Sequence, residues 1–204
     1  MTPTQATSPS DVLQLWFGEL DAEGLSDQEH TRSWWRKDAD FDADLRTRFG
    51  QLHPRCMAGL CDLWLATPTG RLAVVIVLDQ FSRNMFRDSA NMFAADALAL
   101  RFALEGIDRG EDASLRTAER VFLYMPLMHS ESLEAQDRCV GLFSAFCQSL
   151  SGSARKAIEA NLDFAQRHRD IIARFGRFPH RNALLGRTSS AEETAFLSEP
   201  GSSF

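Results

Sequence analysis

Apolar residues recur at helical spacing along most of this chain, and short polar segments separate them. Ser8-Pro9-Ser10-Asp11 is typical of a helix start, and Gly18 closes the apolar positions that follow. The same kinds of signal predict further helices after a capping box at 26–29, after Asp38 or Asp40, over 56–65, from Ser89 to about Gly110 and over 115–124. They also predict a helix from Ser130 or Ser132 to near 151–153, a long helix from there to Gly176, a short one over 180–185, and a last one after a capping box at 189–192. We therefore expect an all-α fold of eight or nine helices packed as antiparallel hairpins.

For one apolar run, composition and length do not distinguish a helix from a strand. LAVVIVL, at residues 72–78, has the β-branched composition of a strand, but its length also suits a buried helix. Since its neighbours are helical, we predict a helix here. Two prolines, Pro54 and Pro126, are expected to interrupt or end the helices that contain them. The predicted organisation is a single helical domain at 8–198 with tails at 1–7 and 199–204, and a docked Phe204 is one hypothesis for the second tail.

The composition is that of a protein with a substantial packed core. The chain has 204 residues, of which 44% are hydrophobic, including 15 Phe and 4 Trp. Its longest apolar run is far shorter than the roughly 20 residues that cross a bilayer, and its first residues do not resemble a signal peptide. We therefore expect a cytoplasmic protein. The four cysteines form no CxxC pair, which favours core positions over a metal or redox site, and the sequence indicates no cofactor.

Charge is distributed unevenly. The net charge of −6 argues against nucleic-acid partners and anionic membranes, yet RHRDIIARFGRFPHRNALLGR, at 167–187, contains six arginines and one acid. Aromatic and aliphatic residues alternate with these arginines, so part of the segment must enter the core. A buried guanidinium needs either an internal carboxylate or a bound anion.

A second polar segment, LDQFSRNMFR at 78–87, follows the apolar run directly. Its candidate ligand-binding residues are Asp79, Arg83, Asn84 and Arg87. Asp79 and Arg83 are four residues apart and would share a face of a helix. The sequence leaves two interpretations open: an internal Asp79–Arg83 pair that closes a helix end, or an arginine aimed at a ligand with Asp79 orienting it.

The third segment, YMPLMHSE at 124–131, places His129 beside Glu131 in an apolar setting. His129 is a candidate general base with Glu131 as its orienting partner, and these two are the candidate catalytic residues. A hydrogen-bonded structural histidine is the other interpretation.

Within the basic segment, FGRFPHRN at 175–182 adds the candidate ligand-binding residues Arg177, His180, Arg181 and Asn182. A Gly and a Pro here predict a helix stop followed by a new helix N-terminus, whose free N–H groups favour an anion. We expect the three polar segments to meet in space, because each supplies groups that would otherwise be buried and unpaired.

Other motifs do not narrow the function. Trp34 and Trp35 can fill the core or stack on a ligand, and the histidines lack the spacing of a metal site, so we expect no metal. The chain has no P-loop, GxGxxG or GxSxG pattern, which removes the easily identified nucleotide-binding and hydrolase classes.

Four stretches carry a resemblance to a known family: LDQFSRNMFR, ERVFLYMPLMHSE, RFGRFPHRNALLGR and the final FLSEPGSSF. In this order they resemble the bacterial Domain of Unknown Function 924 family, over nearly the whole chain from the WFG at 16–18. The resemblance implies a helical fold similar to tetratricopeptide-like α/α superhelices, and it implies no activity or catalytic residue. Pro54 departs from the expected pattern and places the helix boundary near it in doubt.

Three functional hypotheses remain. The first is a pocket for a small anionic ligand, a carboxylate or phosphate compound, with acid/base chemistry at His129. The second is a protein-interaction module that holds a peptide or its C-terminal carboxylate, as superhelical folds do. In the third, the arginines are satisfied internally by Asp38, Asp79, Glu119 and Glu131 and only hold helices together.

Overall fold

The structure is a computed structural model that describes residues 7–202, and within this range every regular element is helical, as predicted. The α-helices are α1 (Pro9–Phe17), α2 (Gln28–Trp35), α3 (Ala39–Phe49), α4 (Leu52–Met57), α5 (Pro68–Ile76), α6 (Ser82–Met85), α7 (Asp96–Asp108), α8 (Thr117–Met128), α9 (Leu133–Gln148), α10 (Gly152–Phe175) and α11 (Ala191–Leu197). Between them lie the 3₁₀ segments η1 (Asp62–Ala66), η3 (Ala90–Phe93), η4 (Glu111–Ser114) and η5 (Pro179–Arg181), and one π-helix, η2 (Val77–Phe81).

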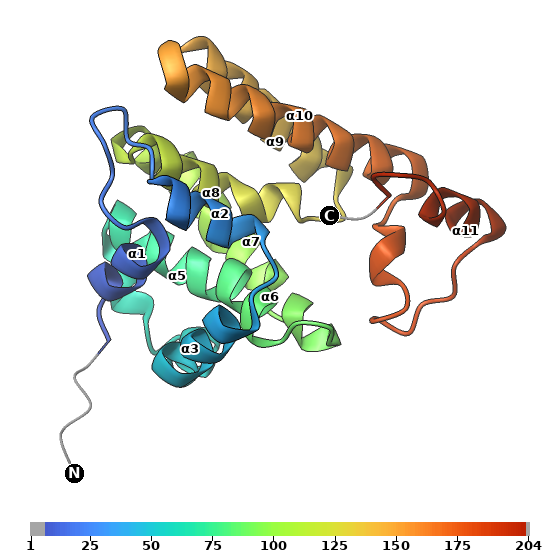
Figure 1. Cartoon of the computed structure of the whole chain (residues 1–204), viewed down its shortest axis with the longest axis horizontal. Helices are drawn as coiled ribbons and strands as arrows, with labels where there is room; N and C mark the ends of the chain where they lie inside the picture. Colours follow the sequence, from blue (N-terminus) through green and yellow to red (C-terminus); the bar gives the residue numbers. More distant parts are fainter. Residues whose placement is uncertain (1–6, 203–204) are drawn as a thin grey trace.

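The central element is α5, which continues through η2 into α6. Helices α1, α7 and α8 pack against α5, and Figure 1 shows it enclosed within the N-terminal bundle. Every residue from Leu72 to Leu78 is at most 1% exposed. A helix that is apolar on all sides must be buried on all sides, so the β-branched run forms a central helix rather than a strand. The helix prediction for residues 72–78 is confirmed.

Helices α9 and α10 form the long antiparallel hairpin in Figure 1 and pack extensively on each other. Ser132 caps the start of α9 through a hydrogen bond to the backbone N–H of Ala135. Gly176 ends α10 with a φ of 70°, a left-handed conformation that glycine adopts without steric cost. Both boundaries agree with the sequence prediction.

The chain beyond α10 turns back and builds a second, smaller core. Phe178 is fully buried against Ile171 and Ile172 of α10, and Phe196 of α11 packs on this group. Ser202 is also buried, and its hydroxyl donates to the carbonyl of Leu197 at 3.2 Å. The chain end therefore packs on the helices as far as Ser202, while Phe204 and residues 1–6 of the expected N-terminal tail lie outside the described range.

Pro126 does not end α8, contrary to the sequence prediction. It lies in the last turn, so the helix loses one backbone hydrogen bond there and continues to Met128. Leu127 and Met128 are buried, and the side-chain amide of Gln136 donates to the carbonyl of Met128 at 2.6 Å. Burial and this side-chain hydrogen bond offset the cost of the proline.

Several other predicted boundaries are wrong. Residues 56–65 do not form one helix, the segment that follows Ser89 begins as η3 before α7, and residues 180–185 do not form an α-helix. Asp27 rather than Ser26 caps α2, and the last capping box is Ser190 with Glu193, one residue beyond the predicted pair. The two cap errors are shifts of one residue, because neighbouring polar residues offer equivalent caps.

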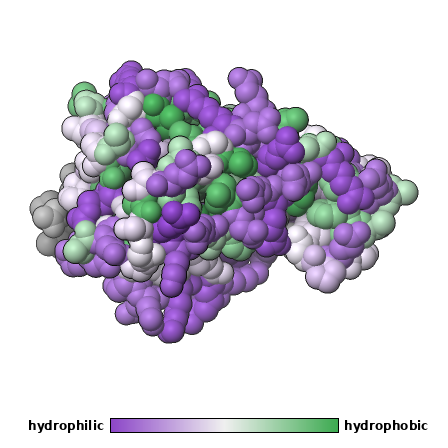
Figure 2. All heavy atoms as spheres, turned by 90° about the horizontal axis from the view of Figure 1, so that it is seen from above, coloured by the Kyte–Doolittle hydropathy of each residue, from purple (hydrophilic) through white to green (hydrophobic). Residues whose placement is uncertain are grey.

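Seen from above in Figure 2, hydrophilic side chains cover much of the surface, with scattered hydrophobic patches. The most exposed large apolar side chains are Leu63, Leu60 and Trp35. Among residues 7–202, no helix combines the length and apolarity needed to cross a membrane.

Candidate functional site

The π-helix η2 places Asp79 inside the protein. Its neighbours Leu78 and Phe81 are fully buried, and Asp79 itself is 1% exposed. A carboxylate at such a position must be paired. Short π-helical turns occur often at functional sites because they realign side chains within a helix. The carboxylate of Asp79 is therefore the starting point of the candidate site.

Three side chains hold this carboxylate. Its Oδ1 lies 2.8 Å from Nδ1 of His129 and 2.9 Å from Nη1 of Arg83, and its Oδ2 accepts from the amide of Gln80 at 2.5 Å. Burial alone would raise the pKa of Asp79, but the charge of Arg83 and the contacts with His129 outweigh burial and lower it. Asp79 is thus an ionised group in the protein interior.

His129 follows α8 directly as its C-cap. A carboxylate only accepts hydrogen bonds, so Nδ1 of His129 carries the proton in the bond to Asp79, and Nε2 of the neutral ring is an acceptor. Burial and the charge of Arg83 lower the pKa of His129, with Asp79 acting in the opposite direction. At neutral pH the arrangement is an oriented imidazole with its basic nitrogen directed away from Asp79.

Arg83 is satisfied internally. Its Nη1 and Nη2 donate to the two carboxylate oxygens of Asp96 at 3.0 and 3.1 Å, and Nη1 also donates to the carbonyl of Asp79 at 2.7 Å. Asp96 is the first residue of α7, so Arg83, which lies on α6, links α6 to that helix. This geometry agrees with the first interpretation of the sequence, in which Asp79 and Arg83 form an internal pair.

Arg181, in η5, reaches the same acidic group from the C-terminal part of the chain. Its Nη1 lies 3.4 Å from Oδ2 of Asp96, and its guanidinium carbon lies 4.7 Å from the ring centre of Phe93 and 4.4 Å from that of Phe178. Its Nε is buried with no hydrogen-bond partner. Burial and the nearby charge of Arg83 lower the pKa of Arg181 to about 10. Arg181 is a buried cation whose hydrogen bonds are incomplete.

Two more imidazoles border this group. The ring centres of His129 and His168 are 6.5 Å apart, and Phe178 lies 5.6 Å from both His168 and His180. Burial lowers the pKa of His168 to about 3 and that of His180 to about 4. Both are neutral near pH 7. The three predicted polar segments do meet, at a group that we call the Asp79 cluster: Asp79, Arg83, Asp96, His129, His168, His180 and Arg181.

Two candidates from the segment at 78–87 belong to a different group. Arg87 donates to both oxygens of Asp42 at 2.7 and 2.9 Å, and Asn84 donates to Asp42 at 2.8 Å. Asp42 lies on α3, so this group connects α3 to the end of α6. The structure does not bring Arg87 or Asn84 to the Asp79 cluster.

Arg177 and Asn182 also lie apart from that cluster. Arg177 donates to both oxygens of Glu193 at 2.6 and 2.8 Å, and Asn182 donates to the hydroxyl of Ser189 at 3.0 Å. Both contacts join residues within the C-terminal segment. The expected helix N-terminus near His180 is a three-residue 3₁₀ turn, which is too short to present an anion-binding helix end.

Glu131 does not orient His129, contrary to the sequence prediction. It binds Arg187 through two hydrogen bonds of 2.6 and 2.9 Å and accepts from the backbone N–H of Phe178 at 2.9 Å. Glu131 therefore fastens the C-terminal segment to the α8–α9 connection. Asp79 takes the orienting role, because the buried π-helix brings its carboxylate to the imidazole while Glu131 faces the arginine.

The internal-pairing hypothesis named two of its four acids correctly. Asp79 and Glu131 do bind arginines of the polar segments, as described above. Asp38 caps α3 and pairs with Arg36, and Glu119 accepts from the backbone N–H of Arg116. Asp96 was missed because it lies outside the polar segments, and His168 was given no role although it lies in the basic segment. Only long-range packing brings the two residues to the Asp79 cluster.

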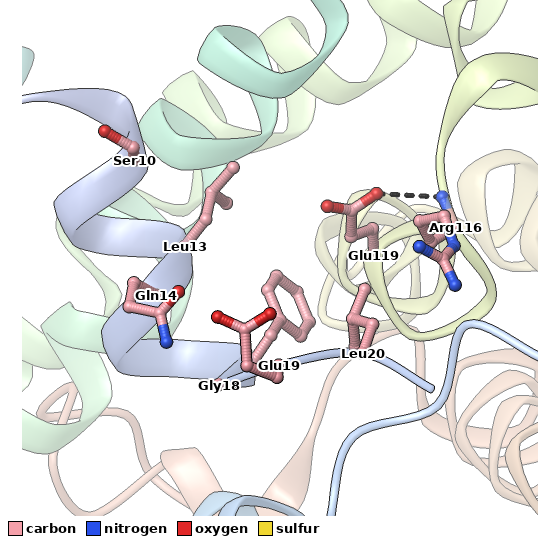
Figure 3. Close-up of a pocket in the computed structure, with 9 residues that line it drawn as sticks. Ser10, Leu13, Gln14, Gly18, Glu19, Leu20, Arg116 and Glu119 are labelled. Atoms are coloured by element: carbon pink, nitrogen blue, oxygen red, sulfur yellow. Dashed lines mark hydrogen bonds between the residues drawn. The ribbon is translucent and has the colours of Figure 1, made fainter. Parts of the chain in front are cut away.

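A cavity of about 290 Å³ lies elsewhere, between α1 and the start of α8 (Figure 3). Leu13 and Gln14 of α1 line one side, and Arg116 and Glu119 line the other. Since α8 is roughly 18 Å long at the helical rise of 1.5 Å per residue, this cavity and His129 lie at opposite ends of the helix. None of the predicted site residues lines the cavity.

The fold and the cluster define an all-helical protein with a buried group of carboxylates, arginines and imidazoles. Among residues 7–202 no group of three or more His, Cys, Asp or Glu side chains is arranged to hold a metal ion. The sequence pattern of the family "Bacterial protein of unknown function (DUF924)" matches residues 12–201, and the chain belongs to this family. Its resemblance to that family is thereby confirmed.

A solved structure from the bacterium Agrobacterium tumefaciens, that of the protein of unknown function ATU0120, is similar to this chain. The two share 37% sequence identity with a TM-score of 0.76, over 93% of this chain and 96% of the other. The comparison with curated proteins found no match.

Proposed function

We propose that this protein binds a small anionic ligand, a carboxylate or phosphate compound, at the Asp79 cluster, with Arg181 as the cationic contact and His129 as the proton-transferring group. The observation that carries the proposal is the unused hydrogen-bonding capacity of two side chains. Nε of Arg181 is buried without an acceptor. The described residues form no hydrogen bond to Nε2 of His129, whose side chain is 16% exposed. A buried N–H without an acceptor calls for a water or ligand partner, and a partly exposed imidazole nitrogen can bind the same partner.

The chemistry of the two groups is complementary. A carboxylate that holds Nδ1–H of an imidazole keeps the ring in one tautomer and leaves Nε2 to accept or donate a proton, which is the arrangement of a general base. A guanidinium is the side chain best suited to a planar oxyanion. Arg83 cannot share this role, because both carboxylates of the cluster already occupy it.

The surroundings strengthen such an interaction. Phe93 and Phe178 contact the guanidinium of Arg181, and the Arg181 side chain is only 8% exposed. In a water-poor setting the attraction between a cation and an anion is several times larger than at the surface. A ligand at Arg181 would also supply the acceptor that its buried Nε lacks.

The alternative function is a module that holds the C-terminal carboxylate of a peptide. One observation favours it: Leu184 and Leu185 follow Arg181 in the chain, and each is 38% exposed. These side chains could contact the apolar residues of a peptide bound at Arg181. A peptide with a free C-terminal carboxylate should then bind far more tightly than the same peptide with a C-terminal amide, and acetate alone should bind weakly.

The direct test is a titration of the protein with acetate and with inorganic phosphate, followed by calorimetry and by the NMR signals of the histidine rings. We expect the ring nitrogens of His129 to shift on binding. Arg181→Met keeps the apolar contacts with the phenylalanines and removes the charge, so it should weaken binding by at least about tenfold, the value of one charge-assisted hydrogen bond.

Arg174→Met is the matched control. It lies in the same basic segment, but its guanidinium is 46% exposed and pairs with Glu192 at the surface. This variant should bind like the unmodified protein. If Arg181→Met binds both anions as tightly as the unmodified protein does, the ligand does not use Arg181 and the proposal fails.

A further inference from the structure

The ionised groups of the Asp79 cluster balance each other. Asp79 and Asp96 supply two negative charges, and Arg83 and Arg181 supply two positive charges. The neighbouring Glu131–Arg187 pair is also balanced. An anion that entered this group with the imidazoles neutral would therefore bring an uncompensated charge into a buried environment, which is strongly unfavourable.

One group can supply the missing positive charge without any rearrangement. His129 already donates from Nδ1 to Asp79, and a proton on Nε2 would convert it into an imidazolium held by that carboxylate. His168 is less suited, because its Nδ1 is engaged by the carbonyl of Phe164 rather than by an acid. His180 is next to Arg181 in the chain, and the charge of Arg181 disfavours a second cation there.

We infer that an anion binds at the Asp79 cluster together with one proton, which Nε2 of His129 holds, so that the preferred ligand is a singly charged oxyanion such as a monocarboxylate. This inference rests on the proposed function. The balance is one proton and one anion taken up per site, with the proton coming from the solvent or from the ligand's own acid form. A doubly charged oxyanion would require a second proton, for which the cluster has no equally placed acceptor.

All charged and titratable groups that face His129 enter this balance. The acids favour the imidazolium, and the arginines and other imidazoles oppose it, as follows from their charges. They are Asp79 of η2, Arg83 of α6, Asp96 of α7, His168 of α10, and His180 and Arg181 of η5. The ligand's own negative charge is the one change that binding adds, and it shifts the balance toward the imidazolium.

The inference has a measurable signature. Acetate remains ionised between pH 6 and pH 8, so any pH dependence of its affinity comes from the protein. Above the pKa of His129 in the free protein, the affinity should fall about tenfold for each unit of pH increase, because one proton must be taken up for each acetate bound.

Calorimetry counts this proton directly. Acetate is titrated into the protein at pH 7.5 in two buffers with different ionisation enthalpies, and the difference in observed heat gives the number of protons taken up. We expect about one proton per acetate, following the linkage between ligand and proton binding. Sulfate, which stays doubly charged in this range, should bind more weakly than acetate.

His129→Gln and His30→Gln form a matched pair. His30 makes the same kind of contact at the surface, with its Nδ1 2.8 Å from Oδ2 of Asp27. His30→Gln should leave proton uptake unchanged, whereas His129→Gln should abolish it and flatten the pH dependence. If His129→Gln does not fold, the ¹⁵N signal of Nε2 in the unmodified protein decides, since acetate should move it from the unprotonated to the protonated range.

The possible outcomes separate the two proposals. If acetate binds without proton uptake, or if the uptake persists in His129→Gln, the inference that His129 takes up a proton is wrong, while the proposal of anion binding stands. If neither acetate, phosphate nor sulfate binds the unmodified protein, anion binding itself fails and the inference falls with it. Proton uptake that disappears only in His129→Gln supports both.

Discussion

Two buried arginines of this protein, Arg71 and Arg181, differ in how completely their surroundings satisfy them. Arg71 lies on α5 with its side chain 1% exposed. Its Nε donates to Glu111 at 2.7 Å, Nη2 donates to the carbonyl of Leu65 at 3.0 Å, and Nη1 donates to the carbonyl of Phe102 at 3.3 Å. All three nitrogens of this guanidinium have acceptors.

Arg181 is nearly as buried but has one hydrogen bond of 3.4 Å to Asp96 and an Nε with no acceptor. Both side chains are charged, and both sit among apolar residues. The comparison shows that burial of an arginine does not by itself indicate a ligand site. What distinguishes Arg181 is the set of N–H groups that the protein leaves unused.

The largest expected effect is the loss of stability when Arg71 is substituted. Arg71→Met should lower the free energy of unfolding by about 3 to 5 kcal/mol, because it removes a buried charge that binds the partly buried Glu111 and two backbone carbonyls. Arg181→Met should cost only about 1 to 2 kcal/mol, since Asp96 keeps Arg83 and one long hydrogen bond is lost. Urea unfolding curves measure both values.

Arg48→Met is the surface control for this pair of variants. Its guanidinium is 47% exposed and pairs with Asp44, so its loss should cost about 0 to 1 kcal/mol. Equal urea midpoints for Arg71→Met and Arg48→Met would show that the network around Arg71 does not stabilise the fold.

A second prediction tests how firmly the Arg71 side chain is held, by adding a methyl group next to it. A Cβ on Gly106 of α7 would lie 2.6 Å from Cδ of Arg71, which its hydrogen bonds hold in place. Gly106→Ala should therefore destabilise the protein by about 1 to 3 kcal/mol through overpacking. The measurement is again the free energy of unfolding in urea.

Gly141→Ala provides the opposite case within a helix. A Cβ there meets nothing within 4 Å, so the substitution should stabilise the protein by about 0.4 to 1 kcal/mol by restricting the unfolded chain. If Gly106→Ala stabilised the protein as Gly141→Ala is expected to do, Arg71 would have to be mobile rather than fixed.

A third prediction concerns pH and the imidazoles near Arg181. His168 has a pKa of about 3 and His180 of about 4 in the folded protein, because burial disfavours their charged forms. Below the usual value near 6.5, the unfolded chain takes up protons that the folded chain does not. Stability should therefore be fully present above pH 6.5 and fall as the pH decreases, by about 1.4 kcal/mol per pH unit for each histidine.

Urea unfolding at pH 7, 6 and 5 measures this slope. His168→Gln should reduce the slope by the share of one histidine. A free energy of unfolding that stays constant from pH 7 to pH 5 would mean that the buried imidazoles take up protons without disturbing the fold.

Much of the helical framework follows from local sequence. The Ser8 capping box, the Ser132 cap and Gly176 each mark a helix boundary that the structure reproduces. These signals are reliable because they involve residues within about one turn of the boundary, where side chains satisfy the free backbone groups at helix ends. Pro126 was misjudged for the opposite reason, since long-range packing and Gln136 offset its local cost.

The candidate site was predictable only in outline. The sequence indicated that arginines embedded among apolar residues need partners, and it identified the three segments that meet at Asp79. It did not indicate that Asp96 would bind both Arg83 and Arg181, or that Glu131 would bind Arg187 rather than orient His129. Several acids lay within plausible reach of each arginine, and local pattern does not rank them.

What the sequence determined by itself is the helical class, several helix boundaries and the presence of charged groups that could not remain in water. The tertiary structure alone decided which of these groups would be saturated and which would keep unused hydrogen-bonding capacity. That outcome depends on packing across α5, α7 and the C-terminal segment, where a shift of about one ångström makes or breaks a hydrogen bond. Arg71 and Arg181 are both buried, and the positions of Glu111 and Asp96 separate a structural arginine from a candidate binding residue.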